Sequence, residues 1–462
     1  MKKRVAQLLA AALLFSTSAR AQTLPDNAQV KRLVDSLGQS FITTHGAPAV
    51  AIAVIRGQDT LAFGAWGLSD IENNVAATPH SVFRIGSITK QFTAGAVMKF
   101  VELNKLRVRD SIGTYLTTLP AAWRGITVQQ LLNHTSGIPD YTHLGARWVK
   151  RWGEVMPPDT LVALTANEPL DFKPGTKWSY DNSGYVILGM LVEKLSGRTW
   201  ATEMDERFFK PFGLAETRYC DTRSIITDRA HGYEQLPNGL FVNAAFLDMS
   251  QPYAAGALCS TVGDLARWNS ALGNGKAVSA SSYLQMTTPS GAAADSNYGY
   301  GLTRRTFEKR IMIRHSGGIP GFISDNAWFP ETQTSITVLT NSGSALTGRL
   351  LDQVARATFG VALLRVATPV ALSAETRAQY VGVYSIRLGN VLVDFAITDR
   401  SGQIFAQLGK QVANPLIPLG NNVFGARFDD KLRITFTVEN GQATKLTLLQ
   451  GGATLQGQRT AN

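Results

Sequence analysis

Residues 83–90 read FRIGSITK and introduce a strongly apolar helical segment. The pattern from 88 to 106 is apolar on nearly all sides, which predicts a helix buried in the core. Ser87 and Lys90 stand at i and i+3 at the start of this helix, so their side chains share one face. A buried Lys can lose its proton and then accept the proton of a serine hydroxyl. The stretch therefore predicts a serine nucleophile on a core helix. The alternative is a surface Ser followed by a Lys whose ammonium reaches solvent.

The segments around this helix predict an α/β (α+β) fold. Both ends of the region combine one helix with strands, whereas its long middle is mainly helical. This order predicts an antiparallel sheet that is assembled from both ends, flanked by the terminal helices and interrupted by a large helical insertion. The expected helices cover residues 27–43, 88–106, 185–195 and 346–359, and the expected strands cover 50–55, 60–68, 311–315, 322–329 and 335–340.

The composition shifts after about residue 372 to short β-type runs that are separated by turn signals. The runs at 391–398, 404–408, 432–438 and 444–449 are typical of a small all-β barrel or sandwich. We therefore divide the chain into residues 22–370, which form the main domain, and residues 371–462, which form a small β-barrel-like accessory domain.

Residues 1–21 have the pattern of a signal peptide. Lys2, Lys3 and Arg4 precede a short apolar run, and Ala19-Arg20-Ala21 is a small-residue cleavage site. Removing its four basic residues reduces the formal net charge from +11 to +7, and no basic run with interleaved aromatics remains. We expect a periplasmic or secreted protein that has no membrane anchor and no nucleic-acid partner.

The two cysteines lie in one segment. Cys220 and Cys259 either form a disulfide, which an oxidising compartment permits, or are two separate buried thiols. The chain contains neither a C-x-x-C nor an H-E-x-x-H motif, so no metal site is expected.

Two further motifs could serve a serine nucleophile. In Tyr180-Asp181-Asn182, a phenol near a cation can relay protons and an amide can orient a substrate amide, although a helix-capping Asp or Asn would have the same pattern. Residues 315–318 read HSGG at the end of an expected strand. Glycines there let a substrate backbone approach the strand edge, or they only form a turn.

The order S-x-x-K, Y-x-N and [HK]-[ST]-G resembles the penicillin-recognising serine hydrolases, which include class C β-lactamases, soluble D-alanyl-D-alanine carboxypeptidases and related esterases. Residues 131–138 (LLNHTSGI) and 255–268 (AGALCSTVGDLARW) are also similar to segments of this family. The resemblance covers about residues 30 to 360. The β-rich tail is similar to the lipocalin-like module that some members carry.

The resemblance implies a role for each motif residue. Ser87 is the acylated nucleophile, Lys90 and Tyr180 form the proton-transfer network, and the backbone N–H groups of Ser87 and Gly318 form the oxyanion hole. The expected substrate-binding residues are Asn182, which orients the amide, His315 and Ser316, which face the substrate carboxylate, and Gly317. His134 is assigned to the scaffold, and chain position alone places Asp140, Tyr141 and His143 at the cleft.

The function implied is an exported serine hydrolase that acts through a covalent acyl-enzyme on D-alanyl peptides or related small amides and esters, without a metal or cofactor. Its third motif starts with His315, as in the H-T-G of the carboxypeptidases, and a neutral imidazole supplies less charge than an ammonium. This disfavours efficient β-lactam hydrolysis. The alternatives are a class C-like β-lactamase or a carboxylesterase and, in a different class, an inactive envelope protein that binds peptidoglycan fragments.

Overall fold

The computed structural model describes residues 24–460 except 46, 237–238, 365–369, 390, 401, 410, 412, 427–431 and 451–452. The main domain is built on a seven-stranded sheet with the strand order β3-β2-β1-β12-β11-β10-β9. All of its pairings are antiparallel, and the sheet joins strands from both ends of the region, which confirms the expected architecture. The strands are β1 (Ala49–Arg56), β2 (Asp59–Asp70), β3 (Val75–Ala76), β9 (Thr303–Phe307), β10 (Arg310–Ile319), β11 (Phe322–Phe329) and β12 (Thr334–Thr340).

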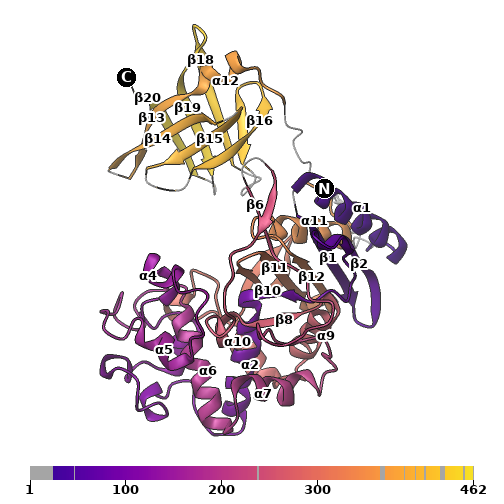
Figure 1. Ribbon diagram of the computed structural model, residues 1–462, viewed down its shortest axis with the longest axis vertical. Coiled ribbons are helices and arrows are strands. Elements are labelled where there is room, and N and C mark those ends of the chain that lie inside the picture. The colour runs from indigo at the N-terminus through magenta and orange to yellow at the C-terminus, as the bar shows by residue number, and fades with distance from the viewer. Residues whose placement is uncertain are drawn as a thin grey trace, which may run out of the picture.

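Two cores lie on opposite faces of this sheet. The terminal helices α1 (Asn27–His45) and α11 (Thr347–Phe359) pack together on one face (Figure 1). Side chains alternate along β1, so Val50 and Ile52 enter the core under these helices, whereas Ala51 and Ala53 enter the core of the helical insertion. The small alanines let the helical insertion approach the sheet closely.

The insertion between β3 and β9 is mainly helical, as expected. Its helices are α2 (Thr89–Glu102), α3 (Val128–Leu132), α4 (Ala146–Val149), α5 (Pro158–Ala163), α6 (Asn182–Ser196), α7 (Trp200–Met204), α8 (Tyr253–Gly256), α9 (Val262–Gly273) and α10 (Ala280–Thr287). It also holds a small sheet of β4 (Phe83–Arg84), β8 (Leu258–Ser260) and β5 (Arg218–Tyr219), and a hairpin of β6 (Tyr233–Gln235) and β7 (Phe241–Asn243).

Residues after 370 form a second lobe (Figure 1). After α12 (Ala374–Tyr380), eight strands close into an antiparallel barrel around an apolar core, so the all-β tail is a barrel and not a sandwich. The strands are β13 (Gly382–Leu388), β14 (Val391–Arg400), β15 (Gln403–Leu408), β16 (Asn414–Gly420), β17 (Val423–Ala426), β18 (Arg433–Glu439), β19 (Gln442–Gln450) and β20 (Ala453–Arg459).

Two expectations from the sequence concern the ends of the chain and its thiols. The expected signal peptide lies outside the described residues, and none of the described helices is long and apolar enough to cross a membrane. Cys220 and Cys259 are both buried and free, and the structure therefore contains two thiols and not a disulfide. They are neighbours, since the Cys259 thiol is close enough to lower the pKa of Cys220.

Candidate active site

Ser87 stands where the short strand β4 turns into the buried helix α2. The turn is the 3-10 segment η1 (Gly86–Ile88). Gly86 has φ = +50°, a conformation that side chains disfavour, and a Cβ there would lie 2.9 Å from the backbone nitrogen of Gly318. Glycine at this position therefore allows the turn that carries Ser87 to lie directly against β10.

Lys90 lies one turn along the helix and is completely buried. Its Nζ atom is 3.0 Å from Ser87 Oγ, 2.8 Å from Asn182 Oδ1 and 2.8 Å from the carbonyl oxygen of Ala255. Burial lowers the pKa of Lys90 from 10.5 to about 7, although the charges of Asp140 and Asp181 oppose this shift.

Three polar neighbours satisfy both protonation states of Lys90. An ammonium can donate to all three, whereas a neutral amine can donate to Asn182 and Ala255 and accept the proton of Ser87. Deprotonation of Lys90 therefore leaves no buried polar group of this cluster without a hydrogen-bond partner. The arrangement suits a general base that works near neutral pH.

Asn182 connects Lys90 to a buried carboxylate. It lies in the first turn of α6, which begins three residues earlier than the sequence indicates. Its Nδ2 atom donates to Asp140 Oδ2 at 2.9 Å, and its backbone nitrogen donates to the same oxygen at 3.1 Å. The side-chain oxygen and nitrogen of Asn182 are thus both hydrogen-bonded within the protein. The substrate contact expected for Asn182 uses the same two atoms. Asp140, placed at the cleft by chain position alone, holds this amide in orientation.

Tyr180 contributes a phenol beside Lys90. Its Oη atom is buried and has no hydrogen-bond partner in the described part of the chain, and its ring centroid lies 4.8 Å from Lys90 Nζ. Burial raises the pKa of Tyr180, and the nearby Ser87 hydroxyl opposes that shift. A buried unpaired hydroxyl beside a nucleophile is available to donate to a substrate atom or a leaving group.

The imidazole of His134 packs against the ring of Tyr180. The centroids of the two rings are 4.4 Å apart, and the backbone nitrogen of Asp181 donates to His134 Nδ1 at 3.1 Å. Burial holds the pKa of His134 well below its usual value, so the imidazole is neutral. These contacts agree with the scaffold role expected for His134. Tyr141 is buried and donates to Gln251, and His143 is exposed. Among the described residues, neither side chain has a hydrogen bond to Ser87, Lys90, Tyr180 or Asn182.

The edge of β10 faces Ser87. β9 pairs only with residues up to Arg314, so residues 315–319 have no strand neighbour on that side. Both hairpins that bound β10 close on two-residue turns, after the pairs Arg310–Phe307 and Ile319–Phe322. Even-numbered N–H groups therefore point away from β11, and the N–H of Gly318 points toward η1.

Gly317 makes this close approach possible. A Cβ at Gly317 would lie 2.0 Å from the carbonyl oxygen of Ile85 and 2.5 Å from Ser324 Oγ, which donates to that same carbonyl. Any side chain would push β10 away from Ser87. Gly86 and Gly317 thus let the turn that carries Ser87 lie against the backbone of Gly318, whose N–H is expected to form the oxyanion hole together with that of Ser87.

His315 is turned into the protein. Its Nε2 atom is 2.8 Å from the Tyr298 hydroxyl, and its Nδ1 atom is 2.6 Å from the carbonyl oxygen of Ser316, to which it can only donate. Burial, together with the positive charge of Lys90, lowers the pKa of His315 to about 3. The imidazole is therefore neutral with both nitrogens engaged, and the exposed Ser316 is the side chain of this motif that remains open to a substrate carboxylate.

One group of side chains among the described residues has the spacing of a metal site. Asp70, Glu72 and His231 offer ligand atoms within 4.8 Å of one another, and two of the three are exposed. Exposed acidic groups commonly lie this close without an ion, and the cluster includes none of the residues around Ser87.

The lowered pKa of Lys90 predicts how acylation depends on pH. Only the neutral amine can accept the Ser87 proton, so the rate of Ser87 modification by a fluorophosphonate should rise as pH rises through about 7. A single group with this pKa gives about a tenfold rise between pH 6 and pH 8. Intact-mass spectrometry measures the rate, and reagent loss in buffer alone is the control at each pH. A rate that stays flat from pH 6 to pH 8 would rule out Lys90 as the titrating base.

Comparison with known proteins adds three findings. The family model described as Beta-lactamase matches residues 30–358. A penicillin-binding protein of Bacillus subtilis (strain 168) is 25% identical over 434 residues, which cover 88% of this chain and 94% of that protein. A D-stereospecific amidohydrolase from Streptomyces sp. is 28% identical with a TM-score of 0.63, over 73% of this chain and 100% of the other.

The likeness in fold extends over the second lobe. The octameric penicillin-binding protein homologue from Pyrococcus abyssi superposes with a TM-score of 0.65 over 94% of this chain and 100% of that one, at 22% identity. At this identity the match concerns the fold alone.

Proposed function

The chain belongs to the β-lactamase family and is a serine hydrolase, and we propose that it cleaves D-alanyl peptides or related small amides and esters through an acyl-enzyme on Ser87. The observation that carries the proposal is the 3.0 Å contact between Ser87 Oγ and a fully buried Lys90 whose pKa is about 7.

The proposed reaction starts with transfer of the Ser87 proton to neutral Lys90. Oγ then attacks the substrate carbonyl carbon, and the resulting oxyanion accepts hydrogen bonds from the backbone nitrogens of Ser87 and Gly318. Collapse of this intermediate breaks the bond to the leaving group, which takes a proton from Tyr180 as Lys90 returns its own to the phenol. Water then attacks the acyl carbon by the same route and releases the acid and free Ser87.

The substrate class follows from the third motif and from the relatives. His315 is neutral and engaged, so the site lacks the ammonium that would bind a β-lactam carboxylate strongly, and Ser316 offers a hydroxyl instead. A penicillin-binding protein and a D-stereospecific amidohydrolase are among the similar proteins. The D-stereospecific amidohydrolase supports a substrate of D configuration. The expected leader at residues 1–21 supports export to a compartment where peptidoglycan fragments are available.

Labelling tests the nucleophile. We expect penicillin or a fluorophosphonate to form a covalent adduct on Ser87, detected by peptide mass spectrometry and absent from the Ser87→Ala variant. Ser316→Ala, which keeps the Ser87–Lys90 pair, should still be labelled by the fluorophosphonate. If no acylating probe labels the protein, the inactive envelope-binding alternative is correct.

A panel of three substrates separates the enzyme alternatives. We expect release of D-alanine from a D-Ala-D-Ala peptide to exceed turnover of nitrocefin and of p-nitrophenyl acetate in kcat/KM. Rapid nitrocefin turnover without peptide activity would identify a β-lactamase, and activity on the acetate ester alone would identify a carboxylesterase.

A further inference from the structure

A cavity of about 300 Å³ lies beside the segment that carries Ser87. Arg84, three residues before Ser87, forms part of its wall, and so does Pro320, two residues after Gly318. An extended strand rises about 3.3 Å per residue, so Pro320 is at most about 7 Å along the chain from Gly318, the expected oxyanion donor. The cavity therefore begins where an extended substrate would leave the catalytic centre.

The lining of the cavity is cationic. Arg84, Arg229 and His231 contribute to it, and its twelve lining residues include no Asp or Glu. Within the described chain, neither guanidinium has a carboxylate oxygen within ion-pairing distance, and Arg229 donates only a long bond of 3.4 Å to the carbonyl of Asp221. His231 has a carboxylate near it, since its Nε2 atom is 3.8 Å from Asp70. A backbone hydrogen bond is the main cause of the lowered pKa of the nearby Asp221 carboxyl, and the charge of Arg229 contributes to it. Neither half-buried guanidinium group, however, has a direct ion pair among the described residues.

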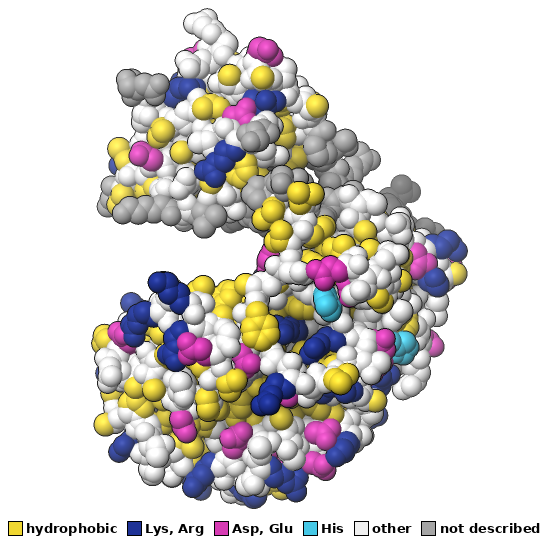
Figure 2. Space-filling view, viewed as in Figure 1, with side chains coloured by type: hydrophobic (Ala, Val, Ile, Leu, Met, Phe, Trp, Pro, Cys, Tyr) yellow, Lys and Arg dark blue, Asp and Glu magenta, His cyan; other side chains and the backbone are white. Residues whose placement is uncertain are grey.

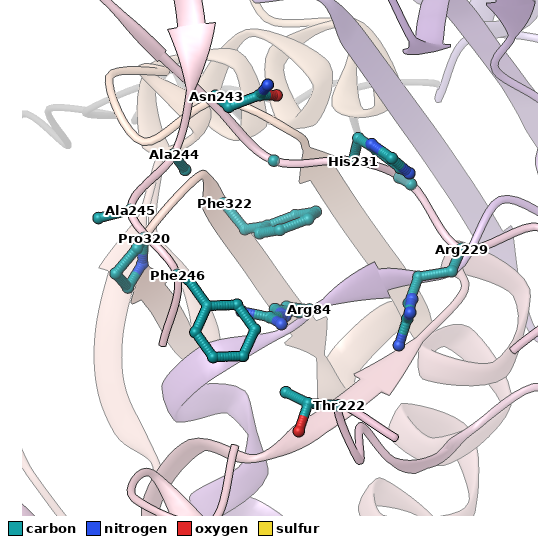
Figure 3. A pocket seen from close by; sticks show the side chains of 12 residues that line it. Arg84, Thr222, Arg229, His231, Asn243, Ala244, Ala245, Phe246, Pro320 and Phe322 are labelled. Carbon is teal, nitrogen blue, oxygen red and sulfur yellow. The ribbon is translucent and has the colours of Figure 1, made fainter. Parts of the chain in front are cut away.

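Aromatic side chains complete the cavity. Figure 3 shows Phe246 and Phe322 at its wall and the guanidinium groups of Arg84 and Arg229 directed into the space beside them. The Arg84 guanidinium carbon is 6.0 Å from the centroid of the Phe322 ring. In Figure 2, Lys and Arg side chains gather with a His near the middle of this face of the main domain. Such a site suits a carboxylate on a short apolar linker, because a guanidinium can bind both carboxylate oxygens.

The direction of a bound substrate places its acyl part at this cavity. The exposed Ser316 is the side chain open to a substrate carboxylate, and in a D-alanyl peptide the terminal carboxylate belongs to the leaving D-alanine. The acyl part then runs the other way, past Gly318 toward Pro320. We propose that the cavity is an acyl-side subsite in which Arg84 and Arg229 bind a carboxylate that the substrate carries a few bonds from the scissile carbonyl. This inference rests on the proposed function and names its substrate class as acyl-D-amino acid derivatives with an anionic acyl group.

A matched pair of substrates tests the subsite. N-succinyl-D-alanyl-D-alanine carries a carboxylate on its acyl part, and the N-succinamoyl compound replaces it with an amide of the same shape. We expect kcat/KM for D-alanine release to be about 10- to 100-fold higher for the anionic substrate, the range for a hydrogen bond to a charged group. Arg229→Met should remove most of this ratio, and Arg229→Lys should keep part of it.

Two variants complete the test. Arg223→Met changes an exposed Arg of the same segment that does not line the cavity, and it should preserve the ratio. Arg84→Met should reduce the ratio as Arg229→Met does, so the result does not depend on one variant. Equal kcat/KM for both substrates in an enzyme whose Ser87 is labelled would overturn the subsite alone. No turnover of either substrate and no label on Ser87 would overturn the proposed function together with the subsite.

Discussion

The Lys90→Met variant is expected to lose acylation of Ser87 by about 10³-fold or more and to remain folded. General-base catalysis contributes about 10²- to 10⁴-fold in enzymes, and Lys90 Nζ is the one basic atom that hydrogen-bonds Ser87 Oγ among the described residues. Met matches the length of Lys and leaves no large cavity. Removing a buried cation relieves its desolvation, which offsets the unpaired acceptors left on Asn182 and Ala255.

Thermal unfolding and mass spectrometry check this expectation together. Melting shows that the variant is folded, and the rate of fluorophosphonate labelling reports acylation. Lys90→Arg is the sharper control, because an Arg keeps the positive charge but cannot lose its proton. It should be as inactive as Lys90→Met. A labelling rate near that of the unmodified protein in either variant would exclude Lys90 as the base.

The Tyr180→Phe variant should separate activity from stability. Among the described residues the Tyr180 hydroxyl has no hydrogen-bond partner, so its removal leaves none of their polar groups unpaired and takes away a desolvated group. We expect the melting temperature to stay the same or to rise. Acylation should fall by about 10²- to 10⁴-fold, because the phenol no longer relays a proton to the leaving group.

Tyr283→Phe provides the matched control. Tyr283 in α10 also has a buried hydroxyl without a partner in the described residues, and it lies outside the site. The same chemical change there should have the same small effect on melting and no effect on labelling. Unchanged labelling and substrate turnover in Tyr180→Phe would show that the phenol only packs against His134 and Lys90.

The sequence predicts those features of the site that depend on local geometry. Ser87 and Lys90 meet because residues at i and i+3 of a helix share a face, and their motif is readable from a few residues. The β11 strand, Phe322–Phe329, coincides with its predicted range, because Pro320-Gly321 before it and Pro330 after it are clear turn signals. Boundaries were less accurate where a motif continued an element: α6 includes Asn182, and β10 runs on through the glycines to Ile319.

The sequence misses features that depend on contacts between distant segments. Asp140 holds the amide of Asn182, yet 42 residues separate them and no pattern links them. His315 lies in a recognisable motif, but its imidazole is buried and hydrogen-bonds Tyr298, 17 residues away. Four strands of the barrel, among them β16 and β17, were not predicted, because short strands with Pro and Gly lack a clear alternation.

The sequence by itself determined the nucleophile, its neighbouring Lys, the antiparallel sheet built from both ends of the main domain and the all-β tail. These follow from residue spacing and from the periodicity of apolar residues, which are local properties. Only the tertiary structure decided that Lys90 has a pKa of about 7, because desolvation depends on everything that packs around the side chain. It also decided that Gly86 and Gly317 let β10 reach Ser87, and that Arg84 and Arg229, 145 positions apart, line one cavity.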